Sequence, residues 1–383
     1  MKKQQKGFIY LDHNATTPVD PDAVKAMMPF LQHEFGNPSS AYALGTSAKQ
    51  GLEKARQEVA YLLGCEGQEL IFTSGGTESN NMIVKGLIDF KHPERFHIIT
   101  SAVEHPAILN PAIFLMQLGV KVTVLPVDRA GRVDPEEIRK AILPNTTLIT
   151  IMLANNETGT LQPIREISGI AKEHGIPFHT DAAQAIGKIE VDVNELGVDF
   201  LTVAGHKLYG PKGVGVLYIR RGRDLASLIH GAGQEDGKRA GTENITLAAG
   251  LGAACRIAKQ RLKDDFQMMK MLRDRLQELM FEGIDGLVLN GHGEERLPNT
   301  LNISIPGLEG GQILEGLPTI MASTGAACHD RTVRLSHVLA AMQVPPEVGM
   351  GALRLTVGRS NTIHEIEEAA RLIIDQVKRM RHG

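Results

Sequence analysis

The sequence of 383 residues predicts an α/β protein: a mostly parallel sheet of seven strands, with a second and smaller α+β unit. Three observations support this fold class. Seven short apolar runs alternate with amphipathic segments of helical periodicity, which is typical of a parallel sheet covered on both faces. One long helical segment follows this region, and the pattern after it is different. The chain is also too long for a single compact core.

The predicted strands each run into a polar or glycine-containing turn. They cover residues 69–75, 95–105, 121–127, 147–153, 176–183, 199–206 and 213–220. Helical patterns lie between them, at 80–90, 106–119, 134–143 and 164–175. Because ligands bind beyond the carboxyl ends of the strands in such sheets, the residues that follow each run are candidate site residues.

The last third of the chain begins with a long helix without an evident break, predicted over 247–280. Shorter elements complete the chain, at 299–305, 312–317, 352–358 and, as an amphipathic helix, 362–380. We expect two domains with the long helix as the bridge between them. They are a large domain of residues 16–258 and a small domain formed by 1–15 and 259–383.

Composition excludes several classes of protein. The net charge of −3 gives no sign of a nucleic-acid surface. Three widely spaced cysteines argue against a disulfide framework and for a reducing compartment, and no CxxC pair indicates a metal site. No apolar stretch is long enough to span a membrane, and the first residues lack the apolar core of a signal peptide. We therefore expect a cytoplasmic protein without a metal ion.

Polar residues stand where three of the predicted strands end. The stretch "TSGGTESNN" (73–81) opens a helix. The backbone N–H groups near Gly76 and the hydroxyl of Thr77 therefore suit a phosphate, although an ordinary glycine turn fits as well. His105 could stack on a flat heteroaromatic ring or carry protons, or it could be a polar turn residue. Asn156 could bind a ligand or close an Asx turn.

Two further strand ends carry charged side chains. Asp181 follows an apolar run and could pair with a protonated ring nitrogen or cap a helix, and Gln184 stands three residues later. Lys207 follows one helix and one strand further along, so neighbouring parallel strands would present Asp181 and Lys207 at one edge. A desolvated lysine has a lowered pKa and can form a Schiff base, whereas a lysine at the surface extends its charge into water.

The combination of these residues is more specific than any one of them. A ring-stacking imidazole, a carboxylate for a ring nitrogen, a hydroxyl for a phosphate and an amine for an imine are together what one cofactor requires. The strand ends therefore predict a site for pyridoxal 5′-phosphate.

A series of motifs resembles the pyridoxal-phosphate-dependent cysteine desulfurases and selenocysteine lyases, which have the fold-type-I architecture of the class-V aminotransferase superfamily. The resemblance covers nearly the whole chain. The motifs are "YLDHNATTP" (10–18), "FGNPSS" (35–40), "TSGGTESNN" (73–81), "VEHPA" (103–107), "NNETG" (155–159), "HTDAAQ" (179–184), "GHKLYGPKG" (205–213), "RAGTEN" (239–244), "ASTGAACHD" (322–330) and "LRLTVGRSNT" (353–362).

The resemblance implies how the ring of the cofactor is held. Lys207 would carry the cofactor as a Schiff base, and His105 would stack over the pyridine ring. Asp181 would keep the ring nitrogen protonated, and Gln184 would form a hydrogen bond with the phenolic oxygen of the ring.

The resemblance also implies a phosphate site formed by Gly76, Thr77 and His206. Thr242 would reach the phosphate bound in the other subunit, so a homodimer with shared sites is expected. One residue departs from the family pattern, because Ala204 stands where many members have a serine that helps to bind phosphate. Thr202 points to the same face of its strand by alternation.

Substrate binding and sulfur transfer are implied in the same way. Asn156 and Arg354 would orient the substrate carboxylate, with Asn37 assisting. Cys328 would accept sulfur as a nucleophilic thiolate, although a reduced, buried cysteine is the more usual state of such a residue. Cys65 and Cys255 match no functional motif.

The expected reaction converts L-cysteine to L-alanine and leaves a persulfide on Cys328, for transfer to an acceptor protein in sulfur metabolism, including iron–sulfur cluster assembly. A selenocysteine lyase that releases selenium from L-selenocysteine is the alternative, because "ASTGAACH" is similar to those enzymes. An aminotransferase would share the fold and Lys207 but would not need Cys328. A cofactor-free scaffold for sulfur relay is a further alternative.

Overall fold

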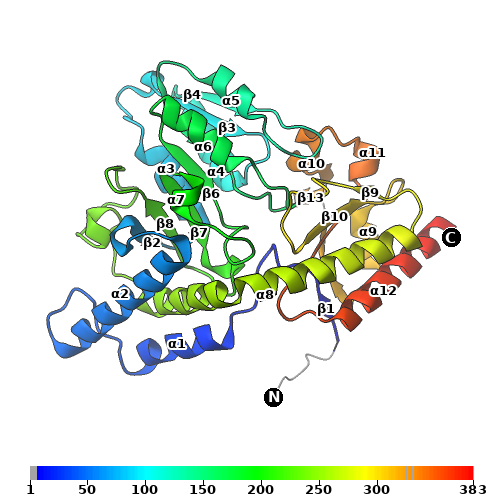
Figure 1. Ribbon diagram of the computed structural model, residues 1–383, viewed down its shortest axis with the longest axis horizontal. Helices are drawn as coiled ribbons and strands as arrows, with labels where there is room; N and C mark the ends of the chain where they lie inside the picture. Colours follow the sequence, from blue (N-terminus) through cyan, green and yellow to red (C-terminus); the bar gives the residue numbers. More distant parts are fainter. Residues whose placement is uncertain (1–6, 325, 330–331, 383) are drawn as a thin grey trace.

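The computed structural model describes residues 7–324, 326–329 and 332–382, and for 326–329 and 332–334 it describes the backbone alone. A seven-stranded sheet dominates the first part of the chain (Figure 1). Its strands, in spatial order, are β2 (Leu70–Thr73), β8 (Gly215–Ile219), β7 (Phe200–Ala204), β6 (Phe178–Asp181), β5 (Thr146–Thr150), β3 (His97–Ser101) and β4 (Lys121–Leu125). β8 runs antiparallel to both of its neighbours, β2 and β7, and the other neighbouring strands of this sheet pair in parallel. The predicted mostly parallel seven-stranded sheet is therefore confirmed.

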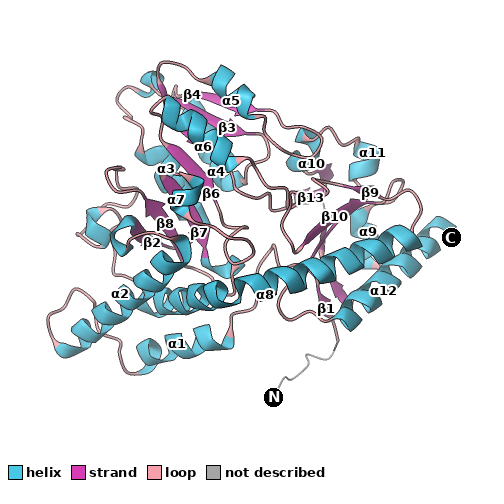
Figure 2. Cartoon of the chain, in the orientation of Figure 1, coloured by secondary structure: helices cyan, strands magenta, loops and turns pink. Residues whose placement is uncertain are grey.

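Helices cover both faces of this sheet (Figure 2). They are α1 (Pro21–Gln32), α2 (Ala43–Leu63), α3 (Gly76–Gly86), α4 (Pro106–Gln117), α5 (Pro135–Ala141), α6 (Ile164–Glu173) and α7 (Val193–Leu196). Single-turn 3₁₀ helices lie at Gly67–Glu69, Pro93–Arg95, Gly205–Lys207 and Glu235–Gly237. Alternate residues of each strand point to opposite faces. Ile149 therefore packs in one core with α2 and α6, and its neighbour Leu148 packs in another with α3 and α4.

The second part of the chain is arranged around α8 (Ile245–Gly283), which runs along the molecule (Figure 1). The first half of α8 belongs to the core beside the large sheet, and its second half belongs to a separate core. A four-stranded sheet lies there, in the order β12 (Ser323–Thr324), β15 (Ala352–Thr356), β10 (Thr300–Ser304) and β9 (Val288–Leu289). The helices of this part are α9 (Gly310–Glu315), α10 (His337–Ala341), α11 (Pro346–Gly349) and α12 (Ile363–His382).

The N-terminal segment joins this second part. β1 (Ile9–Tyr10) pairs in parallel with β11 (Ile320–Met321), and Leu11 lies in the second core. The described part of the N-terminal segment therefore lies with the second part of the chain, and the division into two domains stays a prediction. Among the residues described, no helix combines the length and the apolar character needed to cross a bilayer.

Candidate functional site

Lys207 lies at the end of the 3₁₀ turn that follows β7. Its Nζ atom donates to the backbone carbonyls of Asn14, at 2.5 Å, and Ala15, at 2.9 Å. Burial and the positive charge of Arg354 lower the pKa of the Lys207 ammonium to about 8. A useful fraction of the amine is therefore uncharged near neutral pH, which is the form that attacks a carbonyl carbon.

Asp181 ends β6, the parallel neighbour of β7. Its carboxylate is buried and held on both oxygens. Asn80 donates to Oδ2 from its Nδ2 at 2.7 Å, and the backbone N–H of Ala183 donates to Oδ1 at 2.9 Å. Because each carboxylate oxygen has two lone pairs, Asp181 can still accept a hydrogen bond from a ligand.

One cavity of about 280 Å³ receives most of the predicted site residues. Its walls come from the carboxyl edge of the large sheet, from the N-terminal segment and from β15. The predicted residues that line it are Gly76, Thr77, His105, Asn156, Asp181, Gln184, His206, Lys207 and Arg354. The cavity brings together residues that are as much as 278 positions apart, from Gly76 to Arg354: some were predicted from strand ends, and His206 and Arg354 were implied by the resemblance.

His105 caps the N-terminus of α4, where its Nδ1 accepts from the backbone N–H of Ala107 at 3.0 Å. An imidazole nitrogen that accepts carries no hydrogen, so the neutral ring holds its proton on Nε2. Burial lowers the pKa of His105, which favours this neutral form. A flat, neutral ring at the cavity wall suits stacking on an aromatic ligand.

The N-terminus of α3 forms the part of the cavity predicted to bind phosphate. Gly76 and Thr77 are the first two residues of α3, whose free N–H groups suit an anion. Burial lowers the pKa of His206 to about 4, so this histidine is neutral. Thr202 does not replace the missing serine at Ala204, because its hydroxyl bonds Nε2 of His179 at 3.1 Å and it does not line the cavity.

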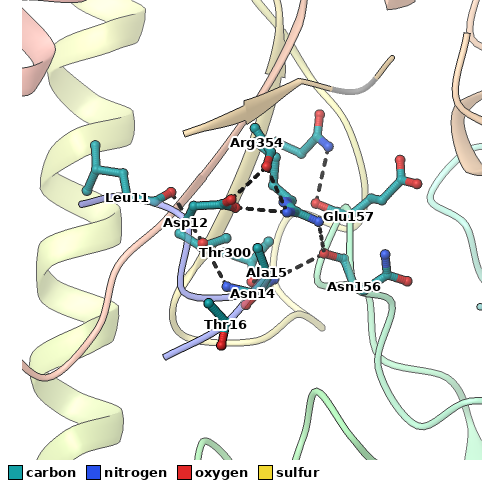
Figure 3. Close-up of polar contacts among 12 residues, drawn as sticks. Leu11, Asp12, Asn14, Ala15, Thr16, Asn156, Glu157, Thr300 and Arg354 are labelled. Carbon is teal, nitrogen blue, oxygen red and sulfur yellow. Dashed lines mark hydrogen bonds and ion pairs between the residues drawn. The ribbon is translucent and has the colours of Figure 1, made fainter. Parts of the chain in front are cut away.

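Arg354 projects from β15 and is held by three groups (Figure 3). Nη2 donates to Oδ1 of Asp12 at 2.8 Å and to Oγ of Ser323 at 3.0 Å, and Nη1 donates to the carbonyl of Asn156 at 3.2 Å. Nε is buried and has no partner among the described residues. The guanidinium is therefore fixed in place, and because Arg354 lines the cavity, its positive charge suits an anionic ligand.

Two predicted site residues, Asn37 and Thr242, do not line this cavity, and the side chain of a third, Cys328, is not described. Asn37 is exposed and its Oδ1 accepts from the N–H of Ser39. Thr242 is exposed and lines a separate cavity of about 210 Å³ that also contains Glu235 and Arg239. The backbone of Cys328 lies in β13 (Ala326–His329), which pairs with β14 (Thr332–Leu335), but its side chain lies outside the described residues.

Several functional candidates escaped the sequence analysis. Asn14 supplies the carbonyl for Lys207, Asn80 holds Asp181, and Asp12 pairs with Arg354. Lys188 is fully buried beside Gln184. Asp12, Asn14 and Asn80 stand in quoted motifs and Lys188 does not, but only burial and contacts, which the motifs do not show, distinguish these residues from ordinary polar residues.

The residues of the cavity fit pyridoxal phosphate. The lowered pKa of Lys207 leaves part of its amine uncharged, so the amine can bond the aldehyde, and Asp181 has a free lone pair for a ring N–H. The N-terminus of α3 suits the phosphate, where a Cβ atom at Gly76 would stand 3.4 Å from that of Ala204. The guanidinium of Arg354 lines the cavity and suits a substrate carboxylate.

The known proteins that this chain resembles agree with a pyridoxal-phosphate site formed by these residues. The model of the aminotransferase class-V family matches residues 9–368. The chain is 47% identical to "Cysteine desulfurase IscS" of Dictyoglomus turgidum over 94% of this chain and 92% of that protein. It is 45% identical to "Cysteine desulfurase IscS" of Methanosarcina thermophila, over 98% and 93%. A solved NifS-like protein superposes with a TM-score of 0.91 at 37% identity, over 97% of this chain and 99% of that one. The chain therefore belongs to the aminotransferase class-V family, in the group of the cysteine desulfurases.

Proposed function

We propose that this protein is a pyridoxal-phosphate-dependent cysteine desulfurase that converts L-cysteine to L-alanine and leaves the sulfur on Cys328 as a persulfide. One observation carries the proposal: Asp181 ends β6, Lys207 lies in the turn after the neighbouring strand β7, and both line the same cavity. The similarity to cysteine desulfurases over nearly the whole chain supports the choice of substrate.

The side chains around the cavity would hold the cofactor in a single orientation. Lys207 would bond its aldehyde carbon, His105 would stack on its ring, and Asp181 would accept from the ring N–H. Gln184 would donate to the phenolic oxygen, while the N-terminus of α3 and His206 would bind the phosphate. Bound there, pyridoxal phosphate supplies an electron sink that stabilises negative charge at the α-carbon of the substrate.

The protein's own groups would orient the substrate and move its protons. Arg354 and Asn156 would hold the substrate carboxylate, which places the α-hydrogen toward Lys207. The amine of the substrate would take the place of Lys207 on the aldehyde carbon. The freed Nζ of Lys207, which is partly uncharged near neutral pH, would then take the proton from the α-carbon. Nε2 of His105 is a second group at the cavity wall that can give or take a proton.

Cys328 would receive the sulfur. Its thiolate attacks the sulfur atom of the substrate, the carbon–sulfur bond breaks and a sulfur–sulfur bond forms. The carbon takes up the bonding electrons and a proton, so cysteine and one thiol become alanine and one persulfide. By contrast, burial raises the pKa of Cys65 to about 12 and also raises the pKa of the fully buried Cys255, so neither is a ready nucleophile.

We also propose a homodimer in which Thr242 serves the phosphate site of the other subunit, and a cytoplasmic enzyme that hands its sulfur to an acceptor protein. Thr242 is exposed and separate from the cavity of its own chain, as a residue that serves a neighbouring subunit would be.

The function is tested by alanine formation from L-cysteine and L-selenocysteine in three variants. Lys207→Ala removes the amine, so activity on both substrates is lost. Cys328→Ala removes the sulfur acceptor, so activity on cysteine is lost while activity on selenocysteine is retained, since selenium leaves more readily. Cys65→Ala is the matched control and keeps both activities.

Other outcomes have distinct meanings. Full cysteine activity in Cys328→Ala contradicts the persulfide mechanism. Wild-type protein that acts on selenocysteine alone is a selenocysteine lyase. Alanine formation that requires a keto acid indicates an aminotransferase. Wild-type protein that shows neither bound cofactor nor activity indicates the cofactor-free scaffold for sulfur relay.

A further inference from the structure

Lys188 is a buried cation that the proposed chemistry does not use. Its side chain is 4% exposed, in the segment that follows β6. The structure gives its Nζ two acceptors, and both belong to Gln184: the backbone carbonyl at 2.8 Å and the side-chain Oε1 at 3.0 Å. Burying an ammonium group is costly, so a lysine at this place calls for an explanation beyond packing.

The contact with Lys188 determines which end of the Gln184 amide faces the cavity. A lysine ammonium has three donors and no acceptor, so it binds Oε1 and not the amide NH₂. The NH₂ group then points the other way, where Nε2 donates to the carbonyl of Asn14 at 3.0 Å. The same carbonyl accepts from Nζ of Lys207, so Nε2 lies on the side of the reactive amine. Its second hydrogen is a donor for a ligand in the cavity that Gln184 lines.

The surroundings of Lys188 are positively charged. Lys207 on the 3₁₀ turn and Arg354 on β15 both repel its charge and, after burial itself, lower the pKa of Lys188 to about 7. His13 in the N-terminal segment and His206 on the 3₁₀ turn also feel its charge, and both are neutral because burial lowers the pKa of each to about 4. An anionic ligand would reduce the electrostatic repulsion among Lys188, Lys207 and Arg354.

We propose that Lys188 is a positioning residue for the cofactor: it fixes the amide of Gln184 so that a donor, Nε2, faces the phenolic oxygen of the ring. The proposal rests on the proposed function, because the ligand is pyridoxal phosphate. An amide turned the other way would present Oε1 to that oxygen and repel its deprotonated form. Lys188 thereby selects a ligand that carries an acceptor at this position.

The test is a pH titration of the visible absorbance of the bound cofactor in Lys188→Met. A donor at the phenolic oxygen stabilises the more negative, deprotonated form of the cofactor. Losing the donor should raise the pH midpoint of the absorbance change by about 1 unit. Ile186→Ala is the control, since Ile186 is fully buried in the same segment. This variant should be less stable and keep the wild-type midpoint.

A second pair of variants separates positioning from a direct effect of charge. In a Gln184→Ala background, Lys188→Met should shift the midpoint far less than in the wild-type background, because the amide is already absent. Lys188→Gln keeps a donor for Oε1 and should restore most of the wild-type midpoint. Should the methionine variant not fold, Lys188→Leu takes its place in both comparisons.

An unchanged midpoint in Lys188→Met overturns the proposal, and so do equal shifts in the two backgrounds, which would show that the charge acts without Gln184. Failure of the proposed function has a different signature: the wild-type protein would bind no pyridoxal phosphate and show no visible band at all.

Discussion

Burial sets the charge of single side chains around the cavity. It lowers the pKa of Lys207 and raises the pKa of Glu104 to about 8, because both groups lose water that stabilises their charged forms. Oε1 of Glu104 accepts from Oγ of Ser101 at 2.7 Å and from the N–H of Met152 at 2.9 Å. Its Oε2 is buried without a partner among the described residues. Burial therefore favours the uncharged, protonated carboxyl group at neutral pH.

Glu104→Gln should therefore stabilise the protein at high pH. In the unfolded chain the Glu104 carboxyl group loses its proton near its ordinary pKa of 4.5, whereas in the folded protein it keeps the proton up to about pH 8. The folded state binds more protons in this window, so this residue's contribution to stability falls as pH rises through it. Glutamine does not titrate. The free energy of unfolding of Glu104→Gln, relative to that of the wild type, should therefore increase by roughly 2–4 kcal/mol from pH 5 to pH 8. Urea unfolding at the two pH values measures this difference. A difference that does not change with pH would count against this account.

At the scale of elements, close helix contacts depend on particular glycines. α8 packs against α2 where Gly252 meets Ala55, and a Cβ atom at Gly252 would stand 2.7 Å from the Cα atom of Ala55. This glycine lies in the interior of a 39-residue helix, where it weakens the helix in isolation. The tertiary contact therefore outweighs helix propensity at this position.

Gly252→Ala should lower the free energy of unfolding by about 1–3 kcal/mol, because the added methyl group overpacks the contact of α2 with α8. Gly169→Ala is the matched control: Gly169 lies inside α6, is exposed, and has no atom within 4 Å of an added Cβ. This variant should gain up to about 1 kcal/mol from helix propensity alone. Equal effects of the two substitutions in chemical unfolding would refute the packing argument.

At the scale of the whole molecule, the site lies where distant parts of the chain meet. The side chain of Asn14 donates to Oγ1 of Thr300 at 2.9 Å, while its carbonyl accepts from Lys207. The N-terminal segment thus connects β10 of the second sheet to the turn after β7. Thr242 extends the argument beyond one chain, because the proposed dimer completes each phosphate site with a residue of the other subunit.

Co-expression of two inactive variants tests the shared site. Lys207→Ala lacks the amine, and Thr242→Glu places a negative charge where the phosphate of the other subunit would bind. A mixed dimer contains one site with neither change, so co-expressed chains should form alanine from cysteine when neither variant alone does. Absence of activity in an isolated mixed dimer would contradict sharing, and a monomeric wild-type protein in light scattering would exclude it.

Much of the fold follows from local pattern. All seven predicted strands of the large sheet are present, each shorter than its apolar run because the ends of the runs form turns. The long helix extends over Ile245–Gly283, close to the predicted 247–280. The reversed direction of β8 was not anticipated. The length of the connection between β7 and β8 indicates this direction. Residues 205–214 are too few to hold the helix that a parallel crossover normally needs.

The sequence by itself determined which chemical groups end the strands, because strand periodicity and the parallel sheet place those residues at one edge. Tertiary structure alone decided what each group touches. Lys207 meets the carbonyl of Ala15, which is 192 residues away, and Lys188 is distinguished from other lysines only by its complete burial. The physical reason is that pKa shifts and amide orientation depend on desolvation and on contacts between distant segments, and neither is present in local pattern.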